Sequence, residues 1–324
     1  MITAPVMKEL YRPIESELGL VRQIVGDLWS ETLALVYGPD VDIPAPGGKL
    51  LRPALTLLSA GASGAEDIAK FAPMATAMEL LHLAALAHDD VIDDADTRRG
   101  ERSLRNRWDN HTAVLGGDYL VARAIALLGG YNATSVILNA VDSVRQMAEG
   151  ELNYFGRSRE AFELDACIRL AKKKTASLFA ISCSTPTYLT DPSWRSSLYA
   201  YGMGMGVAFQ IADDVLDLVQ DAETLGKPSC GDLVEGKRTL PILCMHEKLD
   251  ADGRARLDSF KGGMADSDRE WVHEMMETTG ARLRSEQLAL EYVAESRYSL
   301  EDFPPSPYRD AMLHIADFVV TRAS

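Results

Sequence analysis

Two aspartate-rich segments with the same internal spacing lie far apart in the chain. They read DDVID at residues 89–93 and DDVLD at residues 213–217. On a helix, residues four apart are neighbours and the adjacent position is offset by about 100°, so the pattern DDxxD gathers its carboxylates on one face. Like charges this close destabilise a helix unless a cation offsets their repulsion. The repeat therefore predicts two helices that each carry a cation-binding patch.

The chemistry of these carboxylates predicts a magnesium site. Oxygen ligands without clustered Cys or His select Mg²⁺ or a similar hard ion, which usually takes only one or two carboxylates and completes its octahedron with water and phosphate oxygens. A solvated acidic helix face would be the ordinary explanation of a single cluster, but repetition beside apolar flanks favours a metal. A phosphate-bearing substrate is therefore expected. The predicted metal ligands are Asp89, Asp90, Asp93, Asp213, Asp214 and Asp217.

The rest of the chain predicts one all-α domain over residues 1–324. Hydrophobic residues make up 47% of the chain, enough for a sizeable core. The apolar stretches at 71–87 and 113–128 have a helical rather than an alternating period. Gly, Pro, Asp and Ser predict loops between helix-length segments, at residues 39–48, 61–64, 129–132, 185–193, 225–236 and 303–307. Gly202, Gly204 and Gly206 could suggest a nucleotide loop, but no strand precedes them, and we expect tight helix packing there instead.

Charge and hydropathy exclude some classes of partner. The net charge of −15 argues against nucleic acid, whose phosphates are bound by Lys and Arg. The longest apolar runs are interrupted by charged residues before they reach the roughly 18 residues of a membrane span. The first twenty residues contain several charges and no apolar segment of the kind found in a secretory signal. We therefore expect a cytoplasmic protein without a membrane span.

Basic residues flank both acidic clusters. Two diphosphates and six aspartates together carry roughly −12, and three divalent ions would supply only +6, so protein cations must contribute. Arginine suits forked contacts to phosphate, whereas lysine acts as a point charge. The candidates are Lys49, Arg52, Arg98, Arg99, Lys174, Lys227 and Lys237.

Six segments in a fixed order resemble the trans-type isoprenyl diphosphate synthases. They are GGKLLRP from Gly47, HDDVIDDADTRRG from His88, GGDYL from Gly116, EGEL from Glu149, KKTA from Lys173, and FQIADDVLDLVQDAETLGKPSCGDLVEGKRTLP from Phe209. The resemblance covers about residues 47–248. It implies an isoprenoid-synthase bundle of roughly ten or more helices around a central cavity. It also implies a homodimer that uses about three Mg²⁺ ions per active site to join isopentenyl diphosphate to an allylic diphosphate.

The resemblance also implies a role for each matching residue. Asp89, Asp90 and Asp93 would bind two Mg²⁺ ions on the allylic diphosphate, and the second cluster would bind a third. Contacts to the allylic diphosphate would come from Arg98, Lys174, Lys227 and Lys237. Those to isopentenyl diphosphate would come from Lys49, Arg52, His82 and Arg99. Thr175 and Gln210 would lie near the reacting carbons. The departing diphosphate would take the final proton, so no general base is assigned.

Product length is expected to depend on the helical turn before the first cluster. In the family this turn forms the floor of the product tunnel, and short-chain enzymes usually place an aromatic residue there. This chain has Ala84 and Ala85, with Leu81 as the next possible stop one turn lower. We therefore expect a product longer than farnesyl diphosphate. Tyr119 or Phe155 could close the tunnel early, which would give a short-chain farnesyl or geranylgeranyl diphosphate synthase.

Two other functions remain open at this point. A terpene cyclase also ionises a diphosphate with Mg²⁺, but it uses one substrate, and the second DDxxD and GGKLLRP count against it. A non-catalytic subunit that sets product length in a heteromer tends to lack the aspartates, and all of them are present here.

Overall fold

The computed structural model describes residues 8–38, 48–93, 97–98, 101–102, 109–156, 163–220 and 229–321. This part of the chain is all-α, as predicted, apart from a hairpin of two-residue antiparallel strands, β1 (Thr97–Arg98) and β2 (Glu101–Arg102). The α-helices are α2 (Glu15–Tyr37), α3 (Leu51–Ala62), α4 (Ala72–Ile92), α6 (Asn110–Gly129), α7 (Thr134–Gly156), α8 (Leu164–Ala171), α9 (Ser177–Ser184), α10 (Arg195–Val219), α12 (Gly231–Glu235), α13 (Leu240–Lys248), α14 (Ala251–Asp258), α15 (Asp266–Thr278), α16 (Ala281–Tyr298) and α17 (Pro307–Thr321). Short turns of 3-10 helix are η1 (Arg12–Ile14), η2 (Ile68–Phe71), η4 (Thr185–Tyr188) and η5 (Pro192–Trp194), and η3 (Lys172–Ala176) is a π-helical turn.

Local sequence explains where the helices that carry the site begin. A proline lies in the first turn of α4, where its missing N–H costs nothing. The Asp109 side chain caps α6 by accepting a hydrogen bond of 2.7 Å from the N–H of Thr112. Apart from Phe71, which ends η2, the predicted apolar stretches 71–87 and 113–128 fall within these helices. The predicted loop 225–236 contains the five-residue helix α12, which its turn-rich sequence did not indicate.

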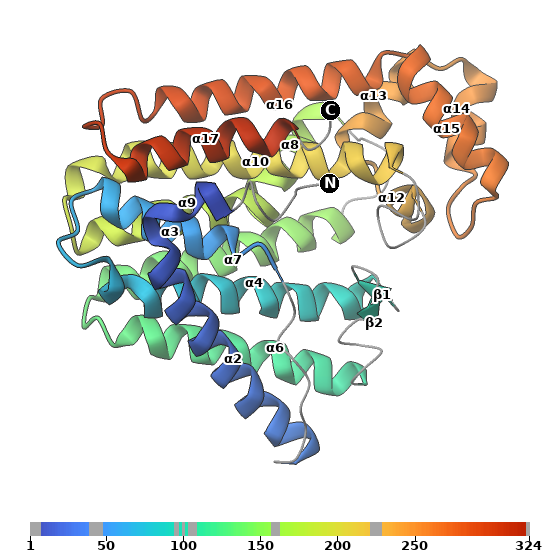
Figure 1. Cartoon of the computed structure of the whole chain (residues 1–324). Helices are drawn as coiled ribbons and strands as arrows, with labels where there is room; N and C mark the ends of the chain where they lie inside the picture. Colours follow the sequence, from blue (N-terminus) through green and yellow to red (C-terminus); the bar gives the residue numbers. More distant parts are fainter. Residues whose placement is uncertain are drawn as a thin grey trace.

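The long helices stack in layers, with α16 and α17 on one side and α4 and α6 on the other (Figure 1). Helix α10 lies between α9 and α16. Three glycines permit this: a Cβ at Gly202 would lie 2.5 Å from the carbonyl oxygen of Phe179, Gly206 packs against Ala176, and Gly204 packs against Ser296. The glycines therefore serve helix packing, as predicted.

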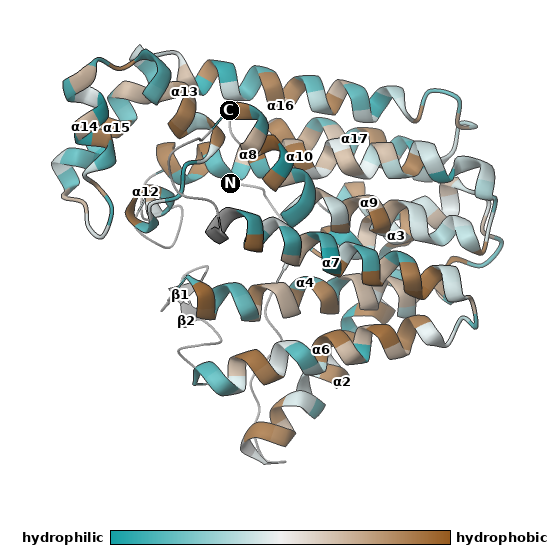
Figure 2. Ribbon diagram, turned by 180° about the vertical axis from the view of Figure 1, so that it is seen from behind, coloured by the Kyte–Doolittle hydropathy of each residue, from teal (hydrophilic) through white to brown (hydrophobic). Residues whose placement is uncertain are grey.

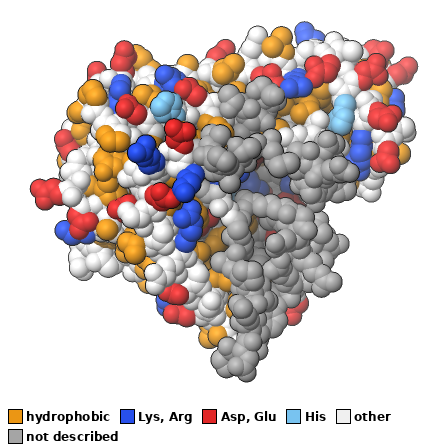
Figure 3. Space-filling view, in the orientation of Figure 1, with side chains coloured by type: hydrophobic (Ala, Val, Ile, Leu, Met, Phe, Trp, Pro, Cys, Tyr) orange, Lys and Arg blue, Asp and Glu red, His pale blue; other side chains and the backbone are white. Residues whose placement is uncertain are grey.

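Apolar side chains from α2 through α17 form one main core. A smaller cluster joins Trp29 and Leu33 of α2 to Ala87 of α4 and Ala113 of α6. Figure 2 shows that apolar and polar residues recur along the long helices. On the face seen in Figure 3, acidic and basic side chains are interspersed with apolar ones. The single-domain assignment for residues 1–324 stays a prediction.

Helix α6 is long and apolar enough to cross a membrane by length and composition alone. The sequence argument that no apolar run is long enough therefore fails for this helix. In the structure α6 packs along α4, and its Arg123 pairs with Glu31 of α2 at 3.0 Å. The absence of a membrane span stays a prediction.

Candidate active site

The two aspartate clusters lie at the same end of the bundle. The first occupies the last turn of α4, and the second occupies the last two turns of α10. Both helices end on the side of the molecule that carries the β1–β2 hairpin and α12 (Figure 1). Helix α12 joins the two, because Lys237, just beyond it, reaches Asp93, and the backbone N–H of Asp232 within it reaches Asp217. The structure therefore brings together two segments that are far apart in sequence.

Lysine ammonium groups contact the first cluster. Lys174 Nζ lies 3.4 Å from Asp89 Oδ2 and also contacts Glu151. Lys237 Nζ lies 2.8 Å from Asp93 Oδ2 and 2.6 Å from Glu235 Oε2. Asp90, in contrast, is buried, with 1% of its surface exposed. Two of the predicted diphosphate-binding lysines are thus already beside the predicted metal ligands.

The charge state of these lysines follows from their neighbours. Burial alone would lower the pKa of Lys174, but Asp89 and Glu151 outweigh it and raise the pKa above its usual value. Burial would also lower the pKa of Lys237. The charges of Asp93, Glu235 and nearby Asp232 outweigh burial, so the pKa of Lys237 is raised. Both side chains therefore carry a positive charge at neutral pH.

In the second cluster, two buried aspartates accept hydrogen bonds from neutral donors. Asp214 and Asp217 are 8% and 6% exposed. The amide of Gln210 donates to Asp214 Oδ1 at 2.8 Å, and the backbone N–H of Asp232 donates to Asp217 Oδ2 at 3.0 Å. Desolvation, followed by the charge of Asp232, raises the pKa of Asp214 well above its usual value. The cluster thus concentrates carboxylates where solvent does not stabilise their charge.

These surroundings fit a hard divalent cation. The donors are all oxygens, and an added positive charge would relieve the desolvation and mutual repulsion that raise the pKa of Asp214. Within the described ranges, no three acidic, His or Cys side chains already converge as a metal-ligand group. At the first cluster, the lysines contact the carboxylates that the resemblance assigns to the metal.

A hydrogen-bonded chain links the second cluster to the turn that carries Lys174. Thr175 donates to Gln210 Oε1 at 2.6 Å, and the same Gln210 amide holds Asp214. Lys174 and Thr175 are consecutive residues of the π-helical turn η3. The structure therefore places Thr175 and Gln210, which the resemblance assigns to the reacting carbons, between the two aspartate clusters.

The residues predicted to hold isopentenyl diphosphate lie at the start of α3 and on α4. The Tyr11 hydroxyl donates to the carbonyl of Lys49 at 2.9 Å. The Arg52 guanidinium lies 4.6 Å from the centre of the Phe179 ring of α9, a distance that permits a cation–π interaction. His82 is half-buried on α4, two turns before Asp89.

Some predicted residues fall outside the described part of the chain. This holds for Arg99 and Lys227, and for the side chains of Arg98 and Phe155. The predicted chain-length residues Leu81 and Ala84 are buried in the main core, and Ala85 is half-buried. Tyr119 is half-buried on α6, beneath Arg123.

The structure adds residues that the sequence reasoning did not assign to the site. Glu151 contacts Lys174, Glu235 contacts Lys237, and Asp232 lies beside Asp214 and Asp217. All three stand within the segments EGEL and GDLVEGK, so their position in those motifs was a usable signal. Tyr11 and Phe179 lie outside the motifs and could be found only from the fold.

Comparison with known proteins gives consistent matches. A family model described as polyprenyl synthetase matches residues 36–279. The all-trans-nonaprenyl-diphosphate synthase (geranyl-diphosphate specific) of Rhodobacter capsulatus is 31% identical over 97% of this chain and 98% of its own length. The short chain isoprenyl diphosphate synthase of Methanothermobacter thermautotrophicus is 34% identical over 93% of this chain and 94% of its own. The crystal structure of a polyprenyl synthase from Caulobacter crescentus, complexed with calcium and isoprenyl diphosphate, has a TM-score of 0.88 and 29% identity, and each chain covers 98% of the other.

Proposed function

This chain belongs to the polyprenyl synthetase family and is a trans-isoprenyl diphosphate synthase, and we propose that it joins isopentenyl diphosphate to an allylic diphosphate with Mg²⁺. The observation that carries the substrate assignment is the meeting of two aspartate clusters at one end of the bundle, with Lys174 and Lys237 beside the first. Carboxylates and charged lysines arranged in this way suit a diphosphate held partly by metal and partly by protein.

The metal would be held by both clusters. Asp89, Asp90 and Asp93 are the proposed ligands on one side, and Asp213, Asp214 and Asp217 on the other. Bound Mg²⁺ would neutralise the diphosphate as it departs, which lowers the barrier to ionisation. Lys174 and Lys237 would exchange their carboxylate partners for diphosphate oxygens, because each is a flexible point charge.

The protein's own groups would then assist carbon–carbon bond formation. The carbon–oxygen bond of the allylic diphosphate breaks, the double bond of isopentenyl diphosphate attacks the resulting cation, and the departed diphosphate takes the proton that is lost. Thr175 gives its hydroxyl hydrogen to Gln210, so its oxygen lone pairs are available to stabilise positive charge. Lys49, Arg52 and His82 would hold the second diphosphate.

We propose a product longer than farnesyl diphosphate. Small side chains at Ala84 and Ala85 support this, since no aromatic ring occupies the turn before the first cluster. The R. capsulatus relative is named for a nonaprenyl product, whereas the M. thermautotrophicus relative is named a short chain synthase. Product length must therefore be measured directly.

The deciding experiment is incubation of the purified protein with isopentenyl diphosphate, Mg²⁺ and each of dimethylallyl, geranyl and farnesyl diphosphate, followed by mass analysis. Elongation beyond fifteen carbons is expected. A cyclised hydrocarbon from one allylic substrate alone would instead show a terpene cyclase. No product with any primer would refute the proposed reaction for this chain and would favour the non-catalytic subunit that sets product length.

We also propose a homodimer formed through α6 and α7. These neighbouring helices expose apolar side chains, among them Leu115 (67% exposed), Leu138 (61%) and Leu152 (71%). In Figure 2 both helices carry apolar residues among polar ones along their length. A contiguous apolar face is typical of an interface, and homodimers commonly pair one such face with its own copy.

The Leu138→Asp variant tests this proposal, because a charge buried at the interface would oppose association. Light scattering should show half the wild-type mass. The matched control is Leu283→Asp on α16, which alters a similarly exposed leucine (59%) elsewhere and should leave the mass unchanged. A monomeric wild-type protein, or a dimeric Leu138→Asp variant, would contradict the proposed interface.

A further inference from the structure

The segment that carries Lys174 and Thr175 is not a regular α-helix. Lys172–Ala176 forms a π-helical turn between α8 and α9, in which the N–H of Ser177 bonds to the carbonyl of Lys172, five residues earlier. Such turns insert one extra residue into a helix and often occur at functional sites. Each residue of an α-helix rotates the chain by about 100°. One extra residue therefore changes the direction of the side chains that follow it relative to those that precede it.

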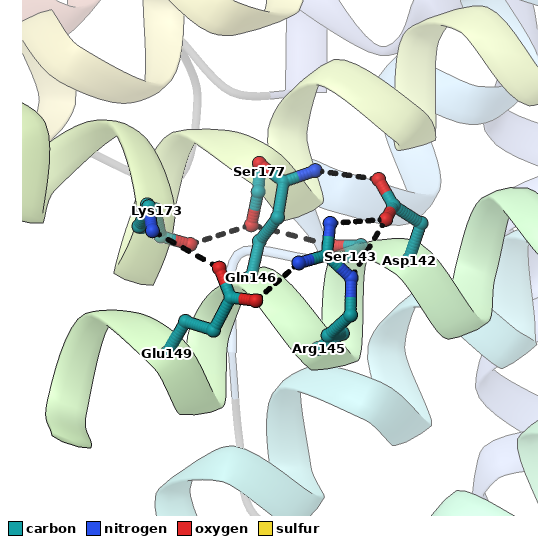
Figure 4. Close-up of polar contacts among 7 residues, drawn as sticks. All are labelled: Asp142, Ser143, Arg145, Gln146, Glu149, Lys173 and Ser177. Atoms are coloured by element: carbon teal, nitrogen blue, oxygen red, sulfur yellow. Dashed lines mark hydrogen bonds and ion pairs between the residues drawn. The ribbon is translucent and has the colours of Figure 1, made fainter.

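Two buried serines satisfy the carbonyl that the π-turn displaces. In a regular α-helix the N–H of Ser177 would serve the carbonyl of Lys173. Here the Ser177 hydroxyl donates to that carbonyl at 2.7 Å, and Ser143 of α7 donates to Ser177 Oγ at 3.3 Å. Both serines are fully buried. Figure 4 shows the two hydroxyls between α7 and the turn.

Helix α7 supports the same turn through Glu149 and Gly150. Lys173 Nζ lies 3.0 Å from Glu149 Oε2. Glu149 is itself held by Arg145, which bonds to Asp142 (Figure 4). A Cβ at Gly150 would lie 3.2 Å from Lys173 Cβ and 3.4 Å from the backbone nitrogen of Lys174, so α7 lies directly against the turn. Lys173 is thereby held towards α7.

The consequence appears at the next two residues. With Lys173 paired to α7, Lys174 contacts Asp89 of α4, and Thr175 donates to Gln210 of α10. Lys174 also contacts Glu151 of α7, so these three consecutive side chains together contact α4, α7 and α10. The hydroxyls of Ser143 and Ser177 and the carboxylate of Glu149 contact the turn. None of these three residues is among the groups that the proposed function places at the substrate.

We propose that Ser143, Ser177 and Glu149 are positioning residues that hold Lys172–Ala176 in its π form and so aim Lys174 and Thr175 at the allylic diphosphate. This inference rests on the proposed function of the site. Loss of the π form would rotate Lys174 and Thr175 away from Asp89 and Gln210. The chemical step would then slow, while the pocket for isopentenyl diphosphate, on α3 and α4, would be unaffected.

Ser177→Ala tests the proposal against a closely matched control, Ser182→Ala. Ser182 is also on α9 and fully buried, and its hydroxyl donates to the carbonyl of Leu178, four residues earlier, at 2.7 Å. Both variants lose one buried hydroxyl and one bond to a helix carbonyl, and Ser177→Ala also removes the acceptor of the Ser143 hydroxyl, so we expect a small decrease in Tm for both and a larger one for Ser177→Ala. Only Ser177→Ala should lower kcat, by about 10- to 100-fold, because small misplacements of reacting groups are costly. KM for isopentenyl diphosphate should stay at the wild-type value.

A second variant and a second measurement separate this inference from the proposed function. Glu149→Gln removes the charge that holds Lys173 and should lower kcat, whereas Glu286→Gln, which weakens the Arg282 pair on α16, should not. Hydrogen exchange on the metal-free protein should show faster exchange over residues 172–177 in Ser177→Ala but not in Ser182→Ala. Unchanged exchange there would overturn the inference, as would equal kcat in the two serine variants when the wild-type protein is active. A wild-type protein without elongation activity but with the expected exchange difference would refute the proposed function alone.

Discussion

The two aspartate clusters have the same spacing but different surroundings. At the first, Asp89 and Asp93 lie beside the ammonium groups of Lys174 and Lys237, at 3.4 Å and 2.8 Å. At the second, Asp214 and Asp217 accept hydrogen bonds from an amide and from a backbone N–H, and burial raises the pKa of Asp214. One sequence motif therefore occurs in two electrostatic environments.

The difference shows that spacing alone does not determine how a carboxylate cluster is charged. Opposite charges within a few ångströms favour the ionised form of a carboxyl group, whereas desolvation disfavours it. At the first cluster, Lys174 and Lys237 form ion pairs with Asp89 and Asp93. At the second cluster, burial raises the pKa of Asp214. On the proposed function, the allylic diphosphate would displace lysine at the first cluster, and a metal ion would displace a proton from Asp214 at the second.

Loss of either cluster should have the largest effect on the reaction. Asp89→Ala and Asp213→Ala should each lower kcat by about 10²- to 10³-fold, because both clusters would stabilise the departing diphosphate. Steady-state kinetics with saturating Mg²⁺ and both substrates measures this. The control is Asp258→Ala, which alters a partly exposed aspartate paired with Arg238 and should leave kcat unchanged. Near-normal turnover in either cluster variant would remove that cluster from the catalytic machinery.

The lysines of the first cluster should control affinity for the allylic substrate. Lys237→Gln keeps a polar side chain but removes the charge, so KM for the allylic diphosphate should rise by about 10- to 100-fold, as expected for the loss of a charge-assisted hydrogen bond. KM for isopentenyl diphosphate should change little. Lys248→Gln, at an exposed lysine on α13, provides the control. Equal increases in both KM values would mean that Lys237 supports the site as a whole rather than one diphosphate.

Much of the fold could be predicted from local patterns. The apolar stretches that became α4 and α6 have a clear helical period, and Asp109 caps α6 through a contact three residues away. The sequence patterns did not predict helix α12, because the residue that holds it in place is distant from it in the sequence. Asp217 receives hydrogen bonds from the backbone N–H groups of Cys230 and Asp232, and no local pattern predicts such contacts.

The site was predictable in its residue types but not in its pairings. The motifs identified both aspartate clusters and the lysines around them. The pairing of Lys237 with Asp93 spans 144 positions of the chain and depends on how α12 packs. The π-turn could not be predicted from the sequence either, since KKKTA has the composition of an ordinary helix. The residues that contact it, Gly150 and buried Ser143, belong to another helix.

The smallest effect, on stability without metal, should have opposite signs at the two clusters. Asp214→Asn removes a desolvated carboxyl group, while its side-chain oxygen can still accept from Gln210. We expect Tm in EDTA to rise by roughly 2 °C or more. Asp93→Asn removes a charged partner of Lys237 and should lower Tm by a similar or smaller amount. Thermal unfolding of the metal-free variants measures both.

The pH dependence makes this last prediction sharper. Because the pKa of Asp214 is raised in the folded state, the folded protein retains a proton there that the unfolded chain loses above the ordinary pKa of 3.8. The wild-type protein therefore loses stability as pH rises through the window between 3.8 and the raised pKa. Asp214→Asn lacks this loss, so its advantage in Tm should grow with pH from about 4 upward. An Asp214→Asn variant that is less stable than wild type across that window would contradict the contrast between the clusters. It would show that the charge of Asp214 is compensated in the folded protein, as Lys237 compensates that of Asp93.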